Sequence, residues 1–185
     1  SGMPPHNAQS NLTFHGLGIA PGLLEILARL RFVTPTPIQY QAIPPAMEGK
    51  DVVGVAQTGT GKTLAFGIPM LQLLAREKGR GLVLLPTREL ALQVEEELHK
   101  IGRPLGLKTA VLIGGAPMRP QLQALGRNPH IVVGTPGRLK DLNNQGKLHF
   151  SQYTSIVLDE VDRMLDMGFI RDVQFIIDKL PQVRQ

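Results

Sequence analysis

The sequence predicts an α/β fold, in which mostly parallel strands form a doubly wound sheet with helices on both faces. Short apolar runs alternate with segments whose apolar residues recur every three or four positions, which is the pattern of strands alternating with amphipathic helices. The runs are apolar at nearly every position, as in strands that are covered on both faces. Polar motifs follow the runs, at the strand ends where ligands bind in such sheets.

The alternation assigns the elements in order. The expected strands cover residues 51–55, 81–85, 109–113, 131–133 and 155–158. Each is followed by an expected helix, at residues 64–74, 87–101, 121–125, 136–143 and 171–180. Two further helices are expected before the first strand, at residues 20–30 and 38–47. Residues 1–13 are expected to be a flexible segment that begins with a cloning remnant, Ser1-Gly2-Met3.

Composition limits the classes of protein to consider. The 185 residues suit one domain with a sizeable core. No run approaches the about 20 apolar residues of a membrane-spanning helix, and no secretory segment begins the chain, so we expect a cytoplasmic protein without membrane contact. The absence of cysteine excludes disulfides and thiolate metal sites, and the five histidines show no metal-ligand spacing and are expected at the solvated surface. A net charge of +5 favours a polyanionic partner such as nucleic acid.

A phosphate-binding loop follows the first expected strand. Residues 56–63 read Ala-Gln-Thr-Gly-Thr-Gly-Lys-Thr, and a helix comes directly after them. The glycines let backbone N–H groups converge on an anion, and the helix N-terminus adds partial positive charge. Lys62 would reach the outer phosphates and the Thr63 hydroxyl would hold Mg²⁺. Ala56 stands where the strict pattern has glycine, but the Lys-Thr pair and the context disfavour the alternative of an ordinary turn.

Two adjacent carboxylates, Asp159 and Glu160, follow the fifth expected strand. In a nucleotide-hydrolysing site, Asp159 would hold Mg²⁺ through water, and Glu160 would take a proton from the attacking water. The alternative is a pair of solvated carboxylates, which would be favoured without the phosphate loop and is disfavoured with it. Asp166 and Asp172 are expected to be surface charges on helices, and Asp162 has a weaker case than the first two carboxylates.

Polar motifs also follow the second, third and fourth strands. They are Pro-Thr-Arg-Glu-Leu at residues 86–90, Gly-Gly at 114–115 and Thr-Pro-Gly-Arg at 135–138. Because the carboxyl ends of parallel strands meet at one edge of a sheet, we expect these motifs to lie together. Arg88, Arg138 and the backbone N–H groups of Gly115 and of the two helix starts could bind the phosphates of a nucleic-acid backbone. Helix capping by Thr87 and Thr135 is the alternative, and both roles can hold at once.

Taken together, these motifs resemble the first RecA-like domain of a DEAD-box RNA helicase, over residues 14–185. Residues 56–63 resemble motif I of that family, and residues 32–39, Phe-Val-Thr-Pro-Thr-Pro-Ile-Gln, resemble its Q motif, with Phe14 as the upstream aromatic residue. The motifs at 86–90, 114–115 and 135–138 resemble its RNA-contacting motifs Ia, Ib and Ic, and Asp-Glu-Val-Asp at 159–162 resembles motif II. The Q motif combined with Pro-Thr-Arg-Glu-Leu makes the resemblance specific to the family.

The resemblance implies roles for individual residues. It implies binding of ATP, or of ADP and AMP as product forms, with adenine hydrogen-bonded by Gln39 and stacked on Phe14. The implied nucleotide-binding residues are Phe14, Thr34, Gln39, Thr58, Gly59, Thr60, Gly61, Lys62 and Thr63. The implied catalytic residues are Glu160, Asp159 and Lys62, and Thr63 and Asp159 are the implied Mg²⁺ residues. RNA would be held by its backbone and 2′-hydroxyls rather than its base edges, at Pro86, Thr87, Arg88, Gly115, Thr135, Pro136 and Arg138.

The sequence departs from the family pattern at three places. Arg31 stands where the Q motif usually has glycine, which affects the rim of the adenine pocket. Val161 replaces the alanine of Asp-Glu-Ala-Asp, and we expect it to be tolerated. The chain ends before the Ser-Ala-Thr motif and the second RecA-like domain of the family, so we expect a truncated, monomeric chain whose missing partner is that second domain.

The expected function is therefore the ATP-binding and catalytic half of an ATP-dependent RNA helicase, which unwinds short duplexes or remodels RNA–protein complexes. An ATP-gated RNA clamp or scaffold remains open, as does a DNA helicase or translocase. A metabolic kinase is disfavoured because no lid or acceptor site is visible. Without the second domain, we expect the chain to bind adenine nucleotides but to show neither RNA-stimulated ATPase nor unwinding activity.

Overall fold

A computed structural model describes residues 53–56 and 60–181 of the chain. The expected helices at 20–30 and 38–47 lie outside the described residues, as do the segment 1–13 and Arg31. The same holds for five residues to which the resemblance assigns a nucleotide-binding role: Phe14, Thr34, Gln39, Thr58 and Gly59.

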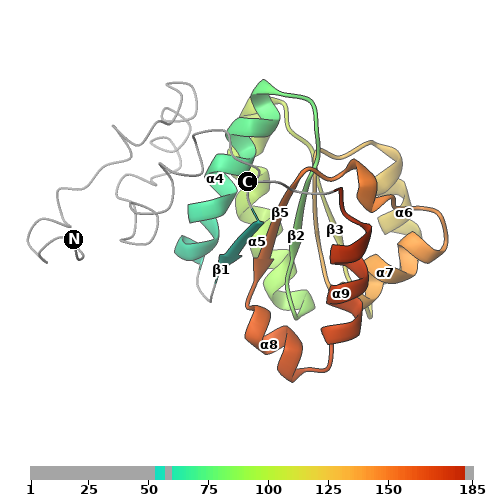
Figure 1. Cartoon of the computed structure of the whole chain (residues 1–185). Coiled ribbons are helices and arrows are strands. Elements are labelled where there is room, and N and C mark those ends of the chain that lie inside the picture. Colours follow the sequence, from blue (N-terminus) through green and yellow to red (C-terminus); the bar gives the residue numbers. More distant parts are fainter. Residues whose placement is uncertain (1–52, 57–59, 182–185) are drawn as a thin grey trace, which may run out of the picture.

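The described strands form one parallel sheet, as the alternation predicts (Figure 1). They are β1 (Val53–Ala56), β2 (Gly81–Leu84), β3 (Thr109–Leu112), β4 (Ile131–Gly134) and β5 (Ser155–Asp159). Their order across the sheet is β1-β5-β2-β4-β3, and every neighbouring pair is parallel. Consecutive strands in the chain are joined by helical crossovers, so the expected doubly wound fold is confirmed.

The helices agree with the predicted segments; three of them are longer by one to six residues, and the other two are shifted by one residue. They are α4 (Thr60–Arg76), α5 (Arg88–Gly102), α6 (Met118–Gly126), α7 (Pro136–Asn144) and α9 (Ile170–Lys179). Three short elements are not predicted from the sequence: the helix α8 (Val161–Asp166) and the 3-10 turns η1 (Arg103–Leu105) and η2 (Phe150–Gln152). Elements this short contain too few turns to show a helical period.

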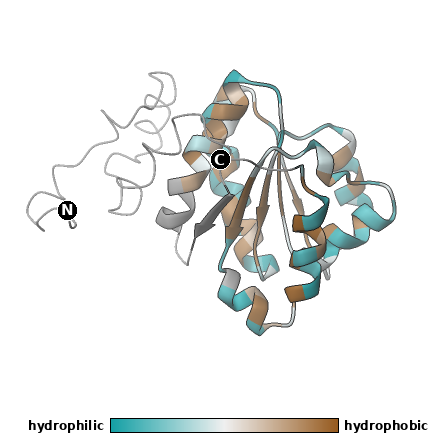
Figure 2. Cartoon of the chain, in the orientation of Figure 1, coloured by the Kyte–Doolittle hydropathy of each residue, from teal (hydrophilic) through white to brown (hydrophobic). Residues whose placement is uncertain are grey.

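The sheet separates two hydrophobic cores, with apolar strands between helices whose outer faces are polar (Figure 2). Alternation along β2 shows the division, because Val83 belongs to the first core whereas Leu82 and Leu84 belong to the second. The first core is packed by α4 and α5, and the second by α7, α8 and α9. Burying each such side chain contributes about 1.5–3 kcal/mol, so packing on both faces holds the strands in place.

The parallel register brings the carboxyl ends of the strands to one edge of the sheet. Ala56 of β1 pairs with Asp159 of β5, and Leu84 of β2 pairs with Gly134 of β4. Gly134 in turn pairs with Leu112 of β3. The segments that leave these strand ends are therefore neighbours, and they include the motifs that are expected to follow the five strands. We call this end of the sheet the motif edge.

Candidate active site

The phosphate loop has the strand–turn–helix arrangement that its pattern requires. β1 ends at Ala56 and α4 begins at Thr60, so Thr60, Gly61, Lys62 and Thr63 form the first turn of α4. This first turn has no acidic residue, so the partial positive charge of the helix N-terminus is not offset by a side chain of the turn itself. The site residues named on the loop remain predictions, because the structure describes only its flanks and the helical part of its backbone.

Asp159 lies beside the start of the phosphate loop and is almost completely buried. It is the last residue of β5, its strand partner is Ala56, and its exposed fraction is 3 %. Burying a carboxylate is costly unless a cation or hydrogen bonds compensate it. Magnesium prefers oxygen ligands and binds through one or two carboxylates together with substrate phosphates. The donor set at this position therefore fits Mg²⁺ next to a nucleotide.

Glu160 occupies a strained backbone conformation at the end of β5. Its φ is 56° and its ψ is 52°, in the left-handed region that residues other than glycine, asparagine and aspartate rarely adopt. This turn lets α8 begin at the next residue, with Met164 N donating to Glu160 O at 3.0 Å. The side chain is 9 % exposed, and its Oε1 lies 3.7 Å from Nη1 of Arg163. A strained, buried carboxylate directly after Asp159 is consistent with a functional position.

The remaining acidic residues of this region have different surroundings. Asp166 is exposed on α8, as expected for a surface charge. Asp172 is on α9, also as expected, but its Oδ1 lies 3.3 Å from Nζ of Lys140, with the carboxylate 26 % exposed. This ion pair connects α7 to α9. Asp162 is exposed in the first turn of α8.

Arg88 and Gly115, from different motifs, are in contact at the motif edge. Nη1 of Arg88 donates to the backbone oxygen of Gly115 at 3.4 Å, and both residues are exposed. Gly115 has a φ of 77°, and a Cβ atom there would lie 3.1 Å from Nη1 of Arg88, so the position favours glycine. Thr87 caps α5, since its Oγ1 accepts from Leu90 N at 3.3 Å. The capping alternative is therefore confirmed for Thr87.

Thr135 does not cap its helix with its side chain, so the capping alternative is wrong for this residue. The residue is at the N-cap position of α7, but its Oγ1 accepts from Gly114 N at 3.2 Å instead. The cause is the register of β4 beside β3, which places the buried Thr135 hydroxyl next to the turn that follows β3. Thr135 thereby joins the motif at 135–138 to the motif at 114–115.

Arg138 is held by acceptors of the α6 region. Its Nη1 donates to Oε1 of Gln121 at 3.0 Å, and both terminal nitrogens donate to the backbone oxygen of Ala116 at 3.3 Å. Gln121 is 6 % exposed and forms two further bonds with Ile113, accepting from its N at 3.2 Å and donating to its O at 3.0 Å. The half-buried guanidinium of Arg138 therefore contacts the same turn as Thr135 does.

Gln121 is the residue that sequence reasoning missed. A signal was present, because Gln121 interrupts the partly buried face of α6 that Met118 and Leu125 form at helical spacing. A buried polar side chain on such a face needs partners, and here it satisfies both backbone groups of Ile113 at the end of β3. Gln121 thus positions the turn that carries the Gly-Gly motif.

The motif edge can bind anions at several points. α5 begins at the exposed Arg88, two residues after the buried Pro86, and α7 begins at the buried Pro136. Helix N-termini and guanidinium groups both favour phosphate. Among the side chains that the structure describes, no three of His, Cys, Asp or Glu gather as a metal site. None of the described helices is long and apolar enough to cross a membrane.

Comparison with known proteins gives one consistent family. The family model of the DEAD/DEAH box helicases matches residues 36–185. The chain is 46 % identical over 175 residues to the DEAD-box ATP-dependent RNA helicase CshA of Bacillus cereus, covering 94 % of this chain and 33 % of that protein. It is 47 % identical over 176 residues to CshA of Streptococcus pneumoniae, covering 94 % of this chain and 34 % of the relative. The chain thus spans about a third of the length of these relatives.

Solved structures of similar fold are also DEAD-box proteins. A DEAD box protein from the hyperthermophile Methanococcus jannaschii superposes with a TM-score of 0.83 at 36 % identity, covering 94 % of this chain and 48 % of that chain. The yeast DEAD-box splicing factor Prp28 superposes with a TM-score of 0.79 at 36 % identity, covering 91 % of this chain and 42 % of that chain. These similarities agree with the motifs that the sheet brings to its motif edge.

Proposed function

Because this chain belongs to the DEAD/DEAH box helicase family, we propose that it is the ATP-binding and catalytic half of an ATP-dependent RNA helicase. The observation that carries the proposal is the register of β1 with β5, which pairs Ala56 with Asp159. This pairing sets the phosphate loop beside the two carboxylates of motif II, as nucleotide hydrolysis requires. In this proposal residues 14–185 are the first RecA-like domain, and residues 1–13 are a flexible segment.

The phosphate loop would bind the nucleotide. Backbone N–H groups at the start of α4 would receive the phosphate oxygens, and Lys62 would contact the outer phosphates. Thr63 and Asp159 would hold Mg²⁺, which would neutralise charge that develops on those phosphates. Phe14, Thr34 and Gln39 would hold the adenine; their roles rest on the Q-motif resemblance alone.

Glu160 would be the general base. Its carboxylate follows Asp159 directly and would accept a proton from the water that attacks the terminal phosphoryl group, giving ADP and inorganic phosphate. The left-handed backbone of Glu160 supports this role, because strain of this kind persists where the surrounding structure holds a side chain in one position. Arg163, close to this carboxylate, would help to hold it.

The rest of the motif edge would hold the RNA backbone. Arg88, Gly115 and the start of α5 form one contact region, and Thr135, Arg138 and the start of α7 form the adjacent one. Both regions present N–H donors suited to phosphate and sugar oxygens, which carry no base sequence. A second RecA-like domain would complete the RNA-binding site by contacting the other side of the RNA. The described residues suit an ATP-gated RNA clamp as well as a helicase. The names of the relatives favour the helicase.

The proposal is tested by substitution of Glu160 in the full-length protein. Glu160→Gln keeps the size of the side chain but removes the base, so RNA-stimulated ATPase should fall by about 10²–10⁴-fold while ATP binding is retained. Asp166→Asn, which alters an exposed carboxylate of the same helical region, should leave both unchanged. Normal turnover by Glu160→Gln would place the base elsewhere and contradict the assignment.

A further inference from the structure

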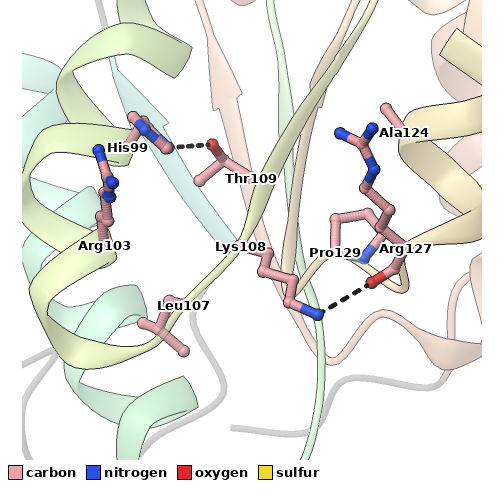
Figure 3. A pocket seen from close by; sticks show the side chains of 8 residues that line it. All are labelled: His99, Arg103, Leu107, Lys108, Thr109, Ala124, Arg127 and Pro129. Carbon is pink, nitrogen blue, oxygen red and sulfur yellow. Dashed lines mark hydrogen bonds between the residues drawn. The ribbon is translucent and has the colours of Figure 1, made fainter. Parts of the chain in front are cut away.

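A concave site lies at the opposite end of the sheet from the motif edge. It is a cavity of about 330 Å³ between the end of α5, the start of β3 and the end of α6. Figure 3 shows His99 and Arg103 on one side, Arg127 on the other, and Lys108 and Thr109 between them. None of the motifs described above contributes a residue to this cavity. Its role is therefore separate from the proposed function.

The cavity is lined by positive charge. Arg103, Lys108 and Arg127 are exposed and line it from three different segments, and no acidic side chain is among the lining residues. Within the described part of the chain, none of these three cations forms an ion pair. Nζ of Lys108 instead donates to the backbone oxygen of Arg127 at 3.4 Å.

One acidic and one imidazole side chain lie beside the cavity. Glu95 of α5 bonds to Thr109 and interacts with His99, and burial raises its pKa. His130, whose Nδ1 accepts from Lys108 N at 3.0 Å, has its pKa lowered by burial and by the charges of Lys108 and Arg80. Positive potential therefore extends around the start of β3.

The fold fixes the backbone that carries these cations without a ligand. Arg103 and Arg127 follow the C-termini of α5 and α6, where the helix dipole favours positive charge. The wall between them is fixed by Leu107 N donating to Gly102 O at 3.0 Å and by the bond from Lys108 to His130. A site whose backbone is already fixed loses less entropy when a ligand binds than one whose backbone must become ordered.

The size and chemistry of the cavity indicate the class of ligand. Its volume is at the lower end of the about 300–1,000 Å³ that small-molecule sites occupy. Guanidinium groups match phosphate oxygens in pairs, and an ammonium group adds charge at a point. Leu107 and Pro129 are buried and provide an apolar wall. The cations surround one cavity instead of following a track, which favours a compact anion over a nucleic-acid strand.

We propose that this cavity binds a small anion that carries two or more phosphate charges, with Arg103 and Arg127 contacting its oxygens from the two helices and Lys108 from the strand. His99 and Thr109, whose Nδ1 and Oγ1 lie 3.3 Å apart, supply further polar contacts. Because the cavity begins at the edge strand β3, such a ligand would connect α5, which carries part of motif Ia at its other end, to α6, which follows the Gly-Gly motif.

The test is a titration with inorganic pyrophosphate, followed by calorimetry and by the backbone amide signals of Lys108 and Thr109. The titration uses the Lys62→Ala variant of the chain, so that the phosphate loop does not bind the pyrophosphate. We expect one site, with affinity reduced about tenfold or more by Arg103→Gln or Arg127→Gln. Lys147→Gln is the matched control, because it removes one exposed positive charge that does not line the cavity. All three side chains are exposed, and an unchanged thermal midpoint verifies that each variant folds.

Fructose 1,6-bisphosphate provides the second arm. Tighter binding of the bisphosphate than of pyrophosphate would identify an organic ligand that uses the apolar wall, and the reverse order would identify an inorganic polyphosphate. Failure of both probes to bind, or equal weakening by Lys147→Gln, would overturn the proposal. Single-stranded RNA that displaced the probe and bound more tightly through the same arginines would also overturn it, in favour of a nucleic-acid contact.

Discussion

Oε1 of Gln121 accepts a hydrogen bond from Nη1 of Arg138 at 3.0 Å, and this contact joins α6 to the motif at 135–138, one of the three motifs proposed to hold RNA. Gln121 belongs to α6 and binds both backbone groups of Ile113 just before the Gly-Gly turn. Arg138 belongs to α7 and also contacts Ala116 just after that turn. One buried amide thus determines the relative position of both segments.

Replacing Gln121 should therefore affect stability and RNA binding together. Gln121→Ala leaves the N–H and C=O of Ile113 buried without this partner, at a cost of about 1–3 kcal/mol for each unsatisfied group. Denaturant unfolding measures the loss, and RNA affinity should fall because Arg138 loses its acceptor. The control is Gln123→Ala, an exposed position on the same helix that should change neither quantity. Wild-type stability of Gln121→Ala would contradict the positioning role.

Apolar periodicity was sufficient to predict the sheet, because burial on both faces leaves a signal in each strand. Parallel topology also predicted that the motifs lie together at one end of the sheet. The hydrogen bond from Arg88 to Gly115, which joins two of these motifs, confirms it. The partner of the Thr135 hydroxyl could not be predicted. A threonine before a helix can cap that helix or bond to another segment, and the choice depends on where the register places Gly114. Likewise, nothing in the residue type of Glu160 indicates a positive φ.

The strain at Glu160 predicts a conflict between stability and activity. Asparagine tolerates the left-handed region better than glutamate does, so Glu160→Asn should raise the free energy of unfolding by about 1 kcal/mol. The same substitution removes the proposed base and should lower the ATPase of the full-length protein by about 100-fold or more. Asn128, with a φ of 54°, supplies the reciprocal test: Asn128→Glu should destabilise the chain. Full activity of Glu160→Asn would refute the assigned role.

His130 predicts a loss of stability in mildly acidic solution. In the folded chain the pKa of His130 lies below its ordinary value of 6.5. Burial is the largest cause, and the charges of Lys108 and Arg80 add to it. The unfolded chain therefore takes up this proton more readily, and the contribution of neutral His130 is present above pH 6.5 and is lost as the pH falls below it. Protonation of Nδ1 would also break its bond with Lys108 N.

The experiment on His130 compares thermal midpoints at about pH 7.5 and about pH 5.5. His130→Asn keeps an acceptor near the position of Nδ1 but does not titrate, so the difference between the two midpoints should shrink. His149→Asn, at an exposed histidine, is the control and should leave that difference as in the wild type. An unchanged pH dependence in His130→Asn would show that His130 does not contribute.

The proposed adenine site predicts discrimination between purines. A side chain that hydrogen-bonds the adenine edge should reject guanine, because each mispaired buried donor or acceptor costs about 1–3 kcal/mol. Calorimetry on this chain should therefore show binding of ADP and little binding of GDP. In Gln39→Ala the preference should disappear. Equal affinity of the wild-type chain for the two nucleotides would remove Gln39 from the site.

The last prediction concerns what the chain does on its own. Phosphoryl transfer in enzymes of this architecture depends on an arginine that stabilises charge on the transferring group, and that residue is worth about 10³–10⁵ in rate. Three arginines near the motif edge already have partners within the chain. Arg88 donates to Gly115, Arg138 to Gln121 and Ala116, and Arg163 lies beside Glu160 itself.

We therefore expect the isolated chain to bind adenine nucleotides without RNA-stimulated ATPase or duplex unwinding. RNA binding should also be weak and should fall further as salt is added, because half of the phosphate contacts would come from the second domain. The measurement is ATP turnover with and without RNA, for the chain alone and for the chain joined to that domain. Turnover should appear only in the joined protein. Robust RNA-stimulated turnover by the chain alone would mean that its own residues supply the complete catalytic site.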